Sequence, residues 1–403
     1  MRVLWLSHFV PYPPKGGNLQ RSYYLLRGLS REAEVDLVSF HRRASLADPI
    51  LDEAKKALSS FCRSVHVYPI PNERSRITFA GGLARNLLER EPYTVAELRS
   101  APFREKVRDL LRSRSYDAVH FDTVDLATYR VLLGGEKSVL NHHNIESRLF
   151  RRRAPYEENR LAGLYLRLQA AKLERFEDRW YEAFDRNLFV SAEEMETIAS
   201  RFPTVQAVVV PNGVDTGYYR PGVGEEEERV VWVGGLGWFP NRDAVSYLTE
   251  RIWPLIRERR RGASLDLVGA APERLVPKNA GSPGIVVHGF VDDLRPIVAR
   301  AAVVIVPLRV GGGTRLKVLD AMAMGKAIVS TTVGFEGIDA ESGKHLVAAD
   351  RPEEIAEAVA RLLGGREERT VLGRNARKLV EERYDWNVVE RTLVTLYREL
   401  AGP

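Results

Sequence analysis

A run of three glycines followed by two cations stands out in the second half of the chain. Residues 303–307 are apolar and are expected to form a strand, and residues 311–314 (Gly-Gly-Gly-Thr) separate them from a stretch with helical spacing. Glycines let the backbone approach a ligand closely, and the free amide groups at a helix start bind phosphate. Arg315 and Lys317 place positive charge in the first turn, where the helix dipole disfavours cations unless an anion shares the site. The segment therefore predicts a phosphate-binding loop.

Asp320 follows Lys317 by one helical turn and shares its face of the helix. Its carboxylate is placed to accept hydrogen bonds from a ribose diol while the glycine loop holds a diphosphate, so the segment is interpreted as a nucleotide site. Two other nucleotide motifs do not occur. The loop lacks the Lys-Ser or Lys-Thr ending of the Walker sequence, and residues 234–237 do not complete the dinucleotide fingerprint. ATP hydrolysis and NAD chemistry therefore lose support.

A shorter glycine pair occurs near the start of the chain. Gly16 and Gly17 follow the first expected strand and open a helical pattern over residues 19–29. Ligands of open α/β sheets bind at the carboxyl ends of the strands, so this turn is a second candidate for ligand contact. An ordinary turn between a strand and a helix explains the pair equally well.

Histidine and aspartate side chains follow two later strands of the first half. His120 and Asp122 end one strand, and His142 and His143 end the next. Adjacent residues of an extended segment point to opposite sides, so at most one of the two neighbouring histidines is expected to be functional. His120, Asp122 and His143 stay open as candidates. No metal site is predicted, because there is neither a helix-spaced histidine pair nor a cysteine nearby.

Short β-branched runs that alternate with helical stretches must position these residues. Such alternation predicts parallel, doubly wound sheets, and near-continuous apolar strands suit sheets covered on both faces. The turn at residues 211–213 (Pro-Asn-Gly), followed by the acidic run at residues 225–228, marks the join between two such series. The expected strands are residues 2–7, 35–40, 64–68, 118–121, 138–141, 186–190 and 207–210, then 230–233, 265–268, 285–288, 303–306, 327–330 and 345–347.

Composition limits the class of protein. A chain of 403 residues with 44% apolar residues can build two or three domains with substantial cores. Sixty Lys and Arg against 54 Asp and Glu give a net charge of +6 spread along the chain, which argues against a dedicated nucleic-acid binder. The single cysteine, Cys62, excludes a disulfide framework. Only four apolar residues precede Ser7 and no apolar run could span a bilayer, so a cytoplasmic protein is expected.

A basic stretch with helical spacing covers residues 147–180. Leu161, Leu164, Tyr165, Leu168 and Leu173 are expected to fall close to one stripe of a long helix. Two interpretations stay open: a surface helix packed on its domain, or a helix that contacts anionic lipid. The basic residues of this part are Arg148, Arg151, Arg152, Arg153, Arg160, Arg167, Lys172, Arg175 and Arg179.

Several motifs together make the chain similar to the retaining glycosyltransferases of family four, which have the GT-B fold. The similar segments are Pro-Tyr-Pro-Pro at 11–14 with the glycines at 16–17, Val-Ser at 190–191, Pro-Asn-Gly-Val-Asp at 211–215, Val-Gly at 268–269, His-Gly-Phe at 288–290 and residues 311–325. The combination of Asn-Gly-Val-Asp with Gly-Gly-Gly-Thr-Arg-Leu-Lys is specific. The chain resembles in particular bacterial members associated with exopolysaccharide and cell-envelope glycan synthesis.

The resemblance implies an α/β protein of GT-B architecture, with two facing Rossmann-like doubly wound domains and an interdomain cleft. Residues 1–210 would form the acceptor-side domain, with the C-terminal helix at 386–403 packing back onto it, and residues 211–385 the donor domain. It implies a nucleotide-sugar donor, a sugar or lipid-linked glycan acceptor, and no metal or other cofactor. A peripheral place on an anionic membrane, at the inner face of the cell membrane, would suit such an acceptor.

The residue pattern and the resemblance together give the expected site residues. Arg315, Lys317, His143 and Asp122 are the expected catalytic residues. The expected donor-binding residues are Gly16, Gly17, Gly235, Asn241, Gly269, Phe290, Gly312, Gly313, Thr314 and Asp320.

The sequence departs from the family pattern at the donor loop. Two glutamates eight residues apart are common in the family, the first touching the sugar and the second the ribose. Gly312 and Asp320 match those positions, so only the ribose contact is expected here, from Asp320. Gly235 and Pro240 stand where the family keeps a phosphate-binding Arg and Lys. Arg315 and Lys317 are the expected substitutes, and Arg242 and Lys15 are the alternatives.

These features favour a retaining glycosyltransferase that moves a sugar from a nucleotide-diphosphate donor to an acceptor hydroxyl. One alternative is a nucleotide-sugar 2-epimerase, which would form product without an acceptor. The other is a degenerate, non-catalytic binding subunit of the same fold, since Gly312, Gly235 and Pro240 have lost common donor contacts.

Overall fold

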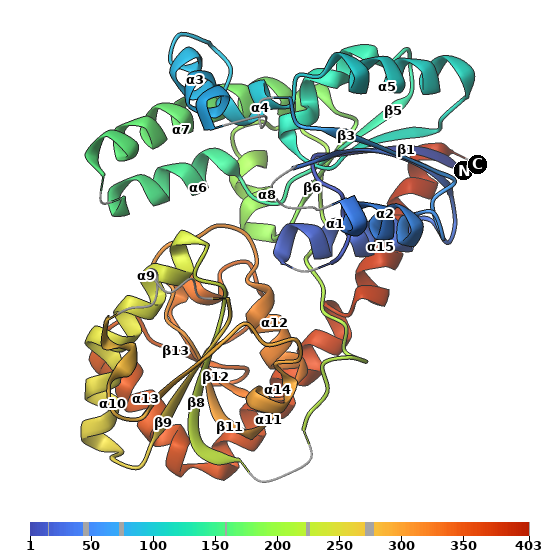
Figure 1. Cartoon of the computed structure of the whole chain (residues 1–403). Helices are drawn as coiled ribbons and strands as arrows, with labels where there is room; N and C mark the ends of the chain where they lie inside the picture. Colours follow the sequence, from blue (N-terminus) through green and yellow to red (C-terminus); the bar gives the residue numbers. More distant parts are fainter. Residues whose placement is uncertain are drawn as a thin grey trace. The chain divides into compact units, whose positions relative to one another are not determined.

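The computed structural model describes residues 1–14, 16–42, 48–71, 76–157, 159–222, 226–270 and 278–402. The chain forms two compact units, shown from blue to red along the sequence in Figure 1. Unit 1 consists of Met1–Pro211 and Val389–Pro403, and unit 2 of Asn212–Val388. From the sequence, the chain is expected to leave the first domain after residue 210 and to return to it at residue 386. Both positions lie within three residues of the observed boundaries.

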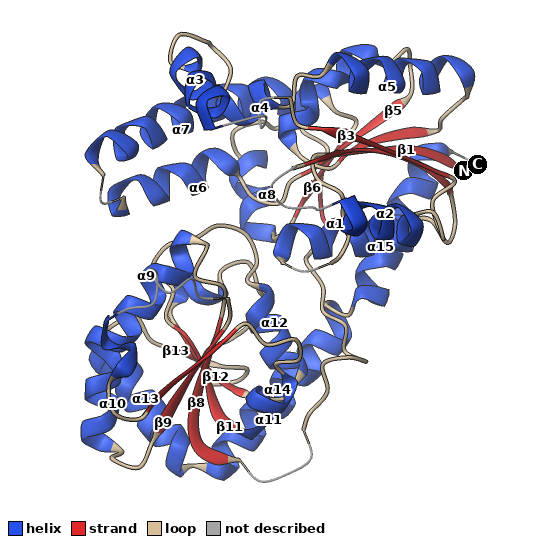
Figure 2. Ribbon diagram, in the orientation of Figure 1, coloured by secondary structure: helices blue, strands red, loops and turns tan. Residues whose placement is uncertain are grey.

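Unit 1 contains a seven-stranded parallel sheet in the order β3-β2-β1-β4-β5-β6-β7, with helices on both faces (Figure 2). The order reverses between β1 and β4, which makes that edge the topological switch point where ligands of such sheets bind. The strands are β1 (Arg2–Ser7), β2 (Glu34–His41), β3 (Ser64–Pro69), β4 (Ala118–Phe121), β5 (Lys137–Asn141), β6 (Arg186–Phe189) and β7 (Ala207–Val209).

The sheet of unit 1 is buried on both faces because its central strands are apolar at successive positions. Val3, Leu4, Trp5 and Leu6 of β1 are all fully buried. The helices of this unit are α1 (Gly17–Leu29), α2 (Asp48–Leu58), α3 (Arg76–Asn86), α4 (Tyr93–Glu97), α5 (Ala101–Ser113), α6 (Glu146–Arg153), α7 (Arg160–Trp180), α8 (Ala192–Ala199) and the C-terminal α15 (Trp386–Ala401).

Unit 2 repeats the design with a six-stranded parallel sheet in the order β10-β9-β8-β11-β12-β13, whose switch point lies between β8 and β11. The strands are β8 (Glu227–Val233), β9 (Ser264–Val268), β10 (Ile285–Gly289), β11 (Ala301–Val306), β12 (Ala327–Ser330) and β13 (Val347–Ala348). The helices are α9 (Phe239–Tyr247), α10 (Trp253–Arg259), α11 (Arg295–Arg300), α12 (Leu316–Ala323), α13 (Pro352–Gly364) and α14 (Arg366–Arg383).

Successive side chains of β8 enter different cores of unit 2. Val230 and Trp232 pack in the core on one face of the sheet, whereas Val231 packs in the core on the other. Each of the thirteen predicted strands is found. The last one is displaced, to Val347–Ala348 instead of residues 345–347, because the amide of Glu341 donates to Nδ1 of His345 (3.0 Å) and holds that residue in a turn.

The sequence suggested one long helix for the basic stretch at 147–180, but the structure has two helices there. α6 and α7 lie side by side, joined by a short 3₁₀ turn at Ala154–Tyr156, and together project from the sheet (Figure 1). Pro155 lacks the amide that would continue α6. Asn159 restarts the helix, since its Oδ1 accepts from the amides of Leu161 (2.9 Å) and Ala162 (3.2 Å).

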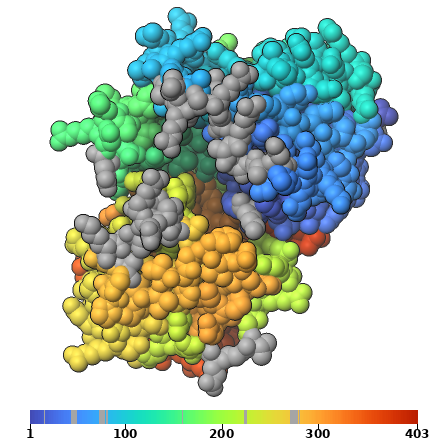
Figure 3. Space-filling view, in the orientation of Figure 1, coloured from blue at the N-terminus to red at the C-terminus, as the bar shows by residue number. Residues whose placement is uncertain are grey.

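The expected leucine stripe on α7 divides between two faces. Leu161 and Leu164 are 78% and 64% exposed and Leu168 is also exposed, whereas Leu173 is buried. Lys172 is buried too and donates to the backbone carbonyl of Asn86, so it is not available to solvent as the sequence suggested. The two helices form the green surface in Figure 3. Within the described residues, no helix has the length and apolar character needed to cross a membrane.

The C-terminal helix α15 contributes to the interior of unit 1. Glu390 is buried and forms ion pairs with Arg27 of α1 (3.2 Å) and with Arg31 in the turn that follows it (2.7 Å). Tyr397 is fully buried, and its hydroxyl lies 2.6 Å from Nδ1 of His120. The last turns of the chain are therefore part of the core around β4.

Candidate functional site

The glycine loop of unit 2 lies at the switch point of its sheet, between the end of β11 and the start of α12. Gly313 has a φ of 66°, a left-handed conformation that favours glycine. The helix begins at Leu316, with Arg315 as its capping residue, so residues 311–314 precede the helix instead of forming its first turn. The loop has the place in the fold that the sequence predicted, and its backbone turns before the helix starts.

Lys317 points from α12 into the turn that follows β8. Its Nζ donates to Oδ1 of Asn241 (2.8 Å) and lies 4.9 Å from the ring centroid of Trp232. Nδ2 of Asn241 in turn donates to the carbonyl of Gly235 (2.9 Å). Burial, together with the nearby charge of Arg315, lowers the pKa of Lys317 to about 7. An anion beside this ammonium group would restore its charge.

Arg315 was expected to direct its side chain at a ligand, but the side chain contacts the protein instead. It is only 4% exposed, and its Nη1 donates to the carbonyls of Gly312 and Gly313. Its Nη2 lies 3.8 Å from the carboxylate of Glu336. Since the guanidinium group is bound to the loop's own backbone, its observed contacts hold the shape of the loop. Thr314 is also buried.

Asp320 lines a small cavity of about 20 Å³ whose other walls are mostly apolar. Lys317, one turn earlier, lines the same cavity, as do Val233, Leu294, Val298, Val304, Val306, Ala321 and Met324. Burial raises the pKa of Asp320 to about 8, although the charge of Lys317 opposes this rise. The carboxyl is therefore protonated at neutral pH in the free protein, where the sequence suggested an ionised acceptor.

Three strand-end loops meet next to Lys317. A Cβ at Gly269, after β9, would overlap the carbonyl of Gly234, after β8, so only glycine allows this approach. The amide of Gly269 donates to the carbonyl of Gly289, which ends β10 (2.8 Å). A Cβ at Gly234 would lie 2.7 Å from Nζ of Lys317. The predicted donor residues Gly235, Asn241 and Gly269 thus gather around one ammonium group.

The remaining expected donor contacts are placed as follows. Phe290 follows β10 and is 63% exposed. Arg242, one alternative cation, donates to the carbonyls of Leu236 (3.2 Å) and Gly237 (3.1 Å), which closes its own turn. Lys15, the other alternative, lies outside the described residues. Gly16 caps α1 and Gly17 is its first residue, both in unit 1.

The strand ends of unit 1 bring together a second polar cluster, consisting of His8, Asp122 and His143. Nδ1 of His8 lies 3.7 Å from Oδ2 of Asp122, and Nε2 of His143 lies 3.5 Å from Oδ1. Burial lowers the pKa of His8 to about 3, while the surrounding histidines hold the pKa of Asp122 well below its usual range despite its burial. The cluster therefore pairs a carboxylate with two side chains that can donate or accept protons.

The structure separates the two neighbouring histidines. His143 faces Asp122, whereas Nε2 of His142 lies 3.0 Å from Oδ1 of Asn187 and its ring stacks on Phe189. His120 is fully buried and stacks on Trp5 with ring centroids 3.5 Å apart, and its Nε2 lies 3.8 Å from Oδ1 of Asp122. His120, Asp122 and His143, which the sequence left open, thus all come together at this edge.

Sequence reasoning missed His8 and the buried Arg21. Arg21 of α1 is fully buried, and two of its nitrogens donate to Oδ1 of Asn141 (3.1 and 2.7 Å). Nδ2 of Asn141 donates to Asp122 (3.1 Å), so Arg21 supports the carboxylate through an intermediate amide. An arginine in a helical pattern normally indicates a solvent-exposed face, and nothing in one sequence marks this one as interior.

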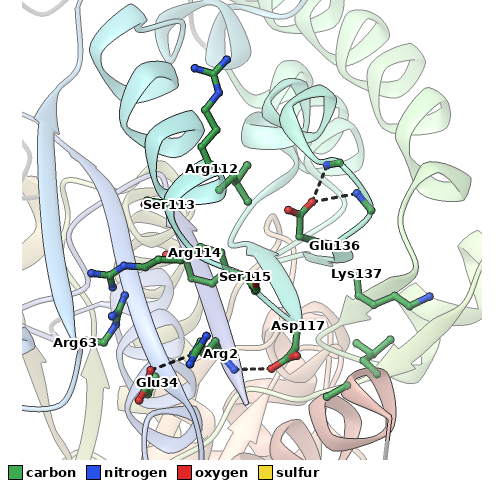
Figure 4. A pocket seen from close by; sticks show the side chains of 16 residues that line it. Arg2, Glu34, Arg63, Arg112, Ser113, Arg114, Ser115, Asp117, Glu136 and Lys137 are labelled. Atoms are coloured by element: carbon green, nitrogen blue, oxygen red, sulfur yellow. Dashed lines mark hydrogen bonds and ion pairs between the residues drawn. The ribbon is translucent and has the colours of Figure 1, made fainter.

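A larger hollow, of about 810 Å³, lies at the opposite edge of the first sheet (Figure 4). It lies at the amino ends of the strands, and its charged side chains bond to one another or to backbone amides. The amide of Arg2 donates to Asp117 (2.7 Å), its guanidinium lies 3.5 Å from Glu34, and Glu136 accepts from the amide of Gly134 (2.7 Å). Ligands of parallel sheets bind at the carboxyl ends, so we assign no functional site here.

Two family models match the chain. Residues 15–218 match the model described as Glycosyltransferase Family 4, and residues 227–364 match the one described as Glycosyl transferases group 1. The first match alone covers half of the chain. The chain belongs to glycosyltransferase family 4.

Several proteins are similar to this family 4 glycosyltransferase over nearly its whole length. An uncharacterized 44.6 kDa protein in the cps region of Klebsiella pneumoniae is 22% identical over 403 residues, which is 95% of this chain and 96% of that protein. Sucrose-phosphate synthase from Thermosynechococcus elongatus has a similar structure, with a TM-score of 0.72 and 17% identity over 99% of both chains. Anabaena HepE in complex with UDP and glucose gives a TM-score of 0.65, with 14% identity, over 98% of this chain and 99% of that one. The two-unit GT-B fold predicted from the sequence is confirmed.

Proposed function

We propose that this glycosyltransferase is a retaining enzyme that transfers a sugar from a nucleoside-diphosphate donor bound in unit 2. The observation that carries this proposal is the ammonium group of Lys317, held by Asn241 beside the glycine loop at the switch point. The printed name of the Anabaena structure, a complex with UDP and glucose, supports a donor of this kind. The cps region named for the Klebsiella relative supports a role in polysaccharide or cell-envelope glycan synthesis.

The proposed chemistry needs compensation for charge that grows on the leaving diphosphate. Lys317 supplies a full positive charge, and the turn amides of the glycine loop add partial charges. Arg315 holds the loop carbonyls away from the anion by bonding to them. Among the described residues of unit 2, no three metal-ligating side chains gather. We propose that the donor site holds the diphosphate with side-chain and backbone groups and without a metal ion.

Unit 1 is proposed to act on the acceptor side through His143 and Asp122. The carboxylate of Asp122 accepts from Ser22 (2.6 Å), Ser7 (3.0 Å) and Asn141, which fixes it as an orienting group for the His143 ring. In a retaining transfer the departing phosphate oxygen can accept the acceptor's proton, so His143 needs only to orient and hydrogen-bond the reacting sugar. Asp320 is proposed to bind the ribose diol.

The surface of α7 supports a peripheral contact with anionic lipid. Leu161, Leu164 and Leu168 are exposed at helical spacing, and the basic side chains exposed on the same helix are Arg160, Arg167, Arg175 and Arg179. Apolar residues next to basic ones are typical of helices that lie at a membrane interface. Such a contact would bring the enzyme to a lipid-linked acceptor.

The test starts with a thermal-shift screen of nucleoside diphosphates and nucleotide sugars, since a ligand that binds only the folded state raises Tm. The donor that stabilises the protein is then incubated with candidate sugar and lipid-linked acceptors. NMR of the product's anomeric proton shows whether the donor configuration is kept. Inversion would refute the retaining assignment, and conversion of the donor without an acceptor would instead indicate an epimerase.

A further inference from the structure

The cluster of His8, Asp122 and His143 has the composition of a metal site. These three residues come from the carboxyl ends of β1, β4 and β5, and one ligand atom of each lies within 4.8 Å of the other two. All three are buried: Asp122 is fully inaccessible, and His8 and His143 are 7% and 6% exposed. We propose that this cluster binds Zn²⁺ and that the bound ion inhibits the transferase.

The two histidine–carboxylate distances are close to the edge length of a tetrahedral zinc site. Zinc lies about 2.0–2.2 Å from nitrogen and oxygen ligands, which places neighbouring ligand atoms about 3.3–3.5 Å apart. Nε2 of His143 lies 3.5 Å from Oδ1 of Asp122 and Nδ1 of His8 lies 3.7 Å from Oδ2, so the carboxylate would turn to present one oxygen to both rings. The two imidazole rings lie edge to face with centroids 5.5 Å apart. Small rotations of these rings would close the remaining edge.

The ring nitrogens involved are available. Nδ1 of His8 and Nε2 of His143 are buried and have no hydrogen-bond partner in the described parts of the chain. A buried polar atom without a partner is costly, and a cation that accepts its lone pair would remove that cost. This observation is independent of the spacing of the three residues.

A supporting shell holds the carboxylate in place. Ser7 and Ser22 donate to Oδ2 of Asp122, and Asn141 donates to Oδ1. Hydrogen bonds of this kind orient the ligands of protein metal sites. Two imidazoles and one carboxylate favour Zn²⁺ and similar transition metals over Mg²⁺, Ca²⁺ and Mn²⁺, which prefer oxygen ligands.

Zinc at this cluster would bind the nitrogen of His143 that faces Asp122 and also the carboxylate, so it would replace the contact by which Asp122 is proposed to orient the His143 ring toward the acceptor. The inhibition, unlike the binding, rests on the proposed function of unit 1. The donor site in unit 2 contains none of these residues, so nucleotide binding should continue when zinc is bound.

The binding test is titration calorimetry of the full chain with Zn²⁺ in a non-chelating buffer. We expect one ion per chain, and a distinct Co²⁺ absorption spectrum when cobalt replaces zinc. His8→Asn and His143→Asn should each weaken binding by about 100-fold or more, since even the loss of a supporting hydrogen bond weakens metal sites by about 10–100-fold. The control His66→Asn, on β3 of the same unit, should bind zinc as the unchanged protein does. Circular dichroism verifies that each variant is folded.

Equal zinc affinity in His8→Asn and His66→Asn, or the absence of stoichiometric binding, would overturn the proposed site. The second measurement is transfer rate against free Zn²⁺, which should fall with a midpoint near the measured Kd and recover with EDTA. Zinc that binds without slowing transfer would overturn the inhibitory role. A protein that binds zinc but transfers no sugar with any donor would instead refute the proposed function and leave the site standing.

Discussion

Replacing Lys317 with methionine tests the proposed donor site most directly. Methionine keeps an unbranched side chain of similar length but removes the charge and the hydrogen bond to Asn241. A hydrogen bond to a charged group is worth about 1.5–3 kcal/mol, which corresponds to roughly tenfold to hundredfold weaker binding of a nucleotide sugar. Binding of the nucleoside alone, which has no phosphates, should not change. Lys344→Met is the matched control, because Lys344 is exposed in the same unit and pairs with Glu341.

The lowered pKa of Lys317 adds a second signal that only a phosphate contact would produce. With a pKa of about 7 in the free protein, roughly one-tenth of the side chains carry a proton at pH 8. A diphosphate beside the amine favours the charged form and raises its pKa, so binding at pH 8 should be accompanied by proton uptake at Lys317. A nucleotide sugar suits this test, because both of its phosphates are esterified and keep their charge from pH 6 to pH 9.

Titration calorimetry at pH 8 in two buffers of different ionisation enthalpy measures this proton uptake. The affinity of the unchanged protein should fall as the pH rises through 7 and above, whereas the affinity of Lys317→Met should vary much less. Steady-state kinetics should show a loss in kcat as well as KM if the contact strengthens as the bond to the sugar breaks. Unchanged donor affinity in Lys317→Met, together with no proton uptake in the unchanged protein, would show that the diphosphate is bound elsewhere.

Four further changes test other parts of the structure. Asp320→Asn should weaken donor binding by about twofold to tenfold, since a hydrogen bond between neutral groups is worth about 0.5–1.5 kcal/mol. Because the pKa of this carboxyl is raised to about 8 from a usual value of 3.8, its stabilising effect is complete below about pH 4 and is lost as the pH rises through 8. The Tm of Asp320→Asn relative to the unchanged protein should therefore rise between pH 5 and pH 9, and a constant difference would contradict the buried, protonated state. Asp122→Asn should lower kcat and leave nucleotide binding unchanged, whereas an equal loss in both would assign Asp122 to the donor site. Arg315→Ala should lower donor affinity and also increase amide hydrogen exchange in residues 311–314, and unaltered exchange would argue against its role in holding the loop. Leu161→Ser with Leu164→Ser should reduce co-sedimentation with anionic vesicles at low salt while leaving Tm unchanged, since both side chains are exposed; equal sedimentation with neutral vesicles would exclude the lipid contact.

The strands and the glycine loop could be predicted because each depends on local sequence. A strand covered on both faces is apolar at successive positions, as Val3 to Leu6 are, and a loop that turns at Gly313 requires glycine. The edge of the sheet that carries the site follows from strand order alone.

The direction of individual side chains could not be predicted in the same way. His8, Asp122 and His143 come from three strand ends that are far apart in the sequence, and only the folded sheet brings them together. Arg315 bonds to its own loop and Arg21 lies inside the unit because carbonyl and amide groups there accept from them. Those partners are set by backbone conformation, which one sequence does not specify.

The chain crosses between its units twice, after Pro211 and again after Val388, so unit 1 is assembled from two separate segments. During synthesis, Tyr397 and Glu390 reach their partners in unit 1 only after all of unit 2 has been made. Arg2 and Leu400 line the same hollow of unit 1, so the two ends of the chain lie close together (Figure 1). A circular permutant that begins at Asn212, with the original ends joined by a short linker, would make each unit continuous and leave a single crossing. In such a molecule unit 2 would be synthesised first and unit 1 second, so neither unit would remain incomplete while the other is made.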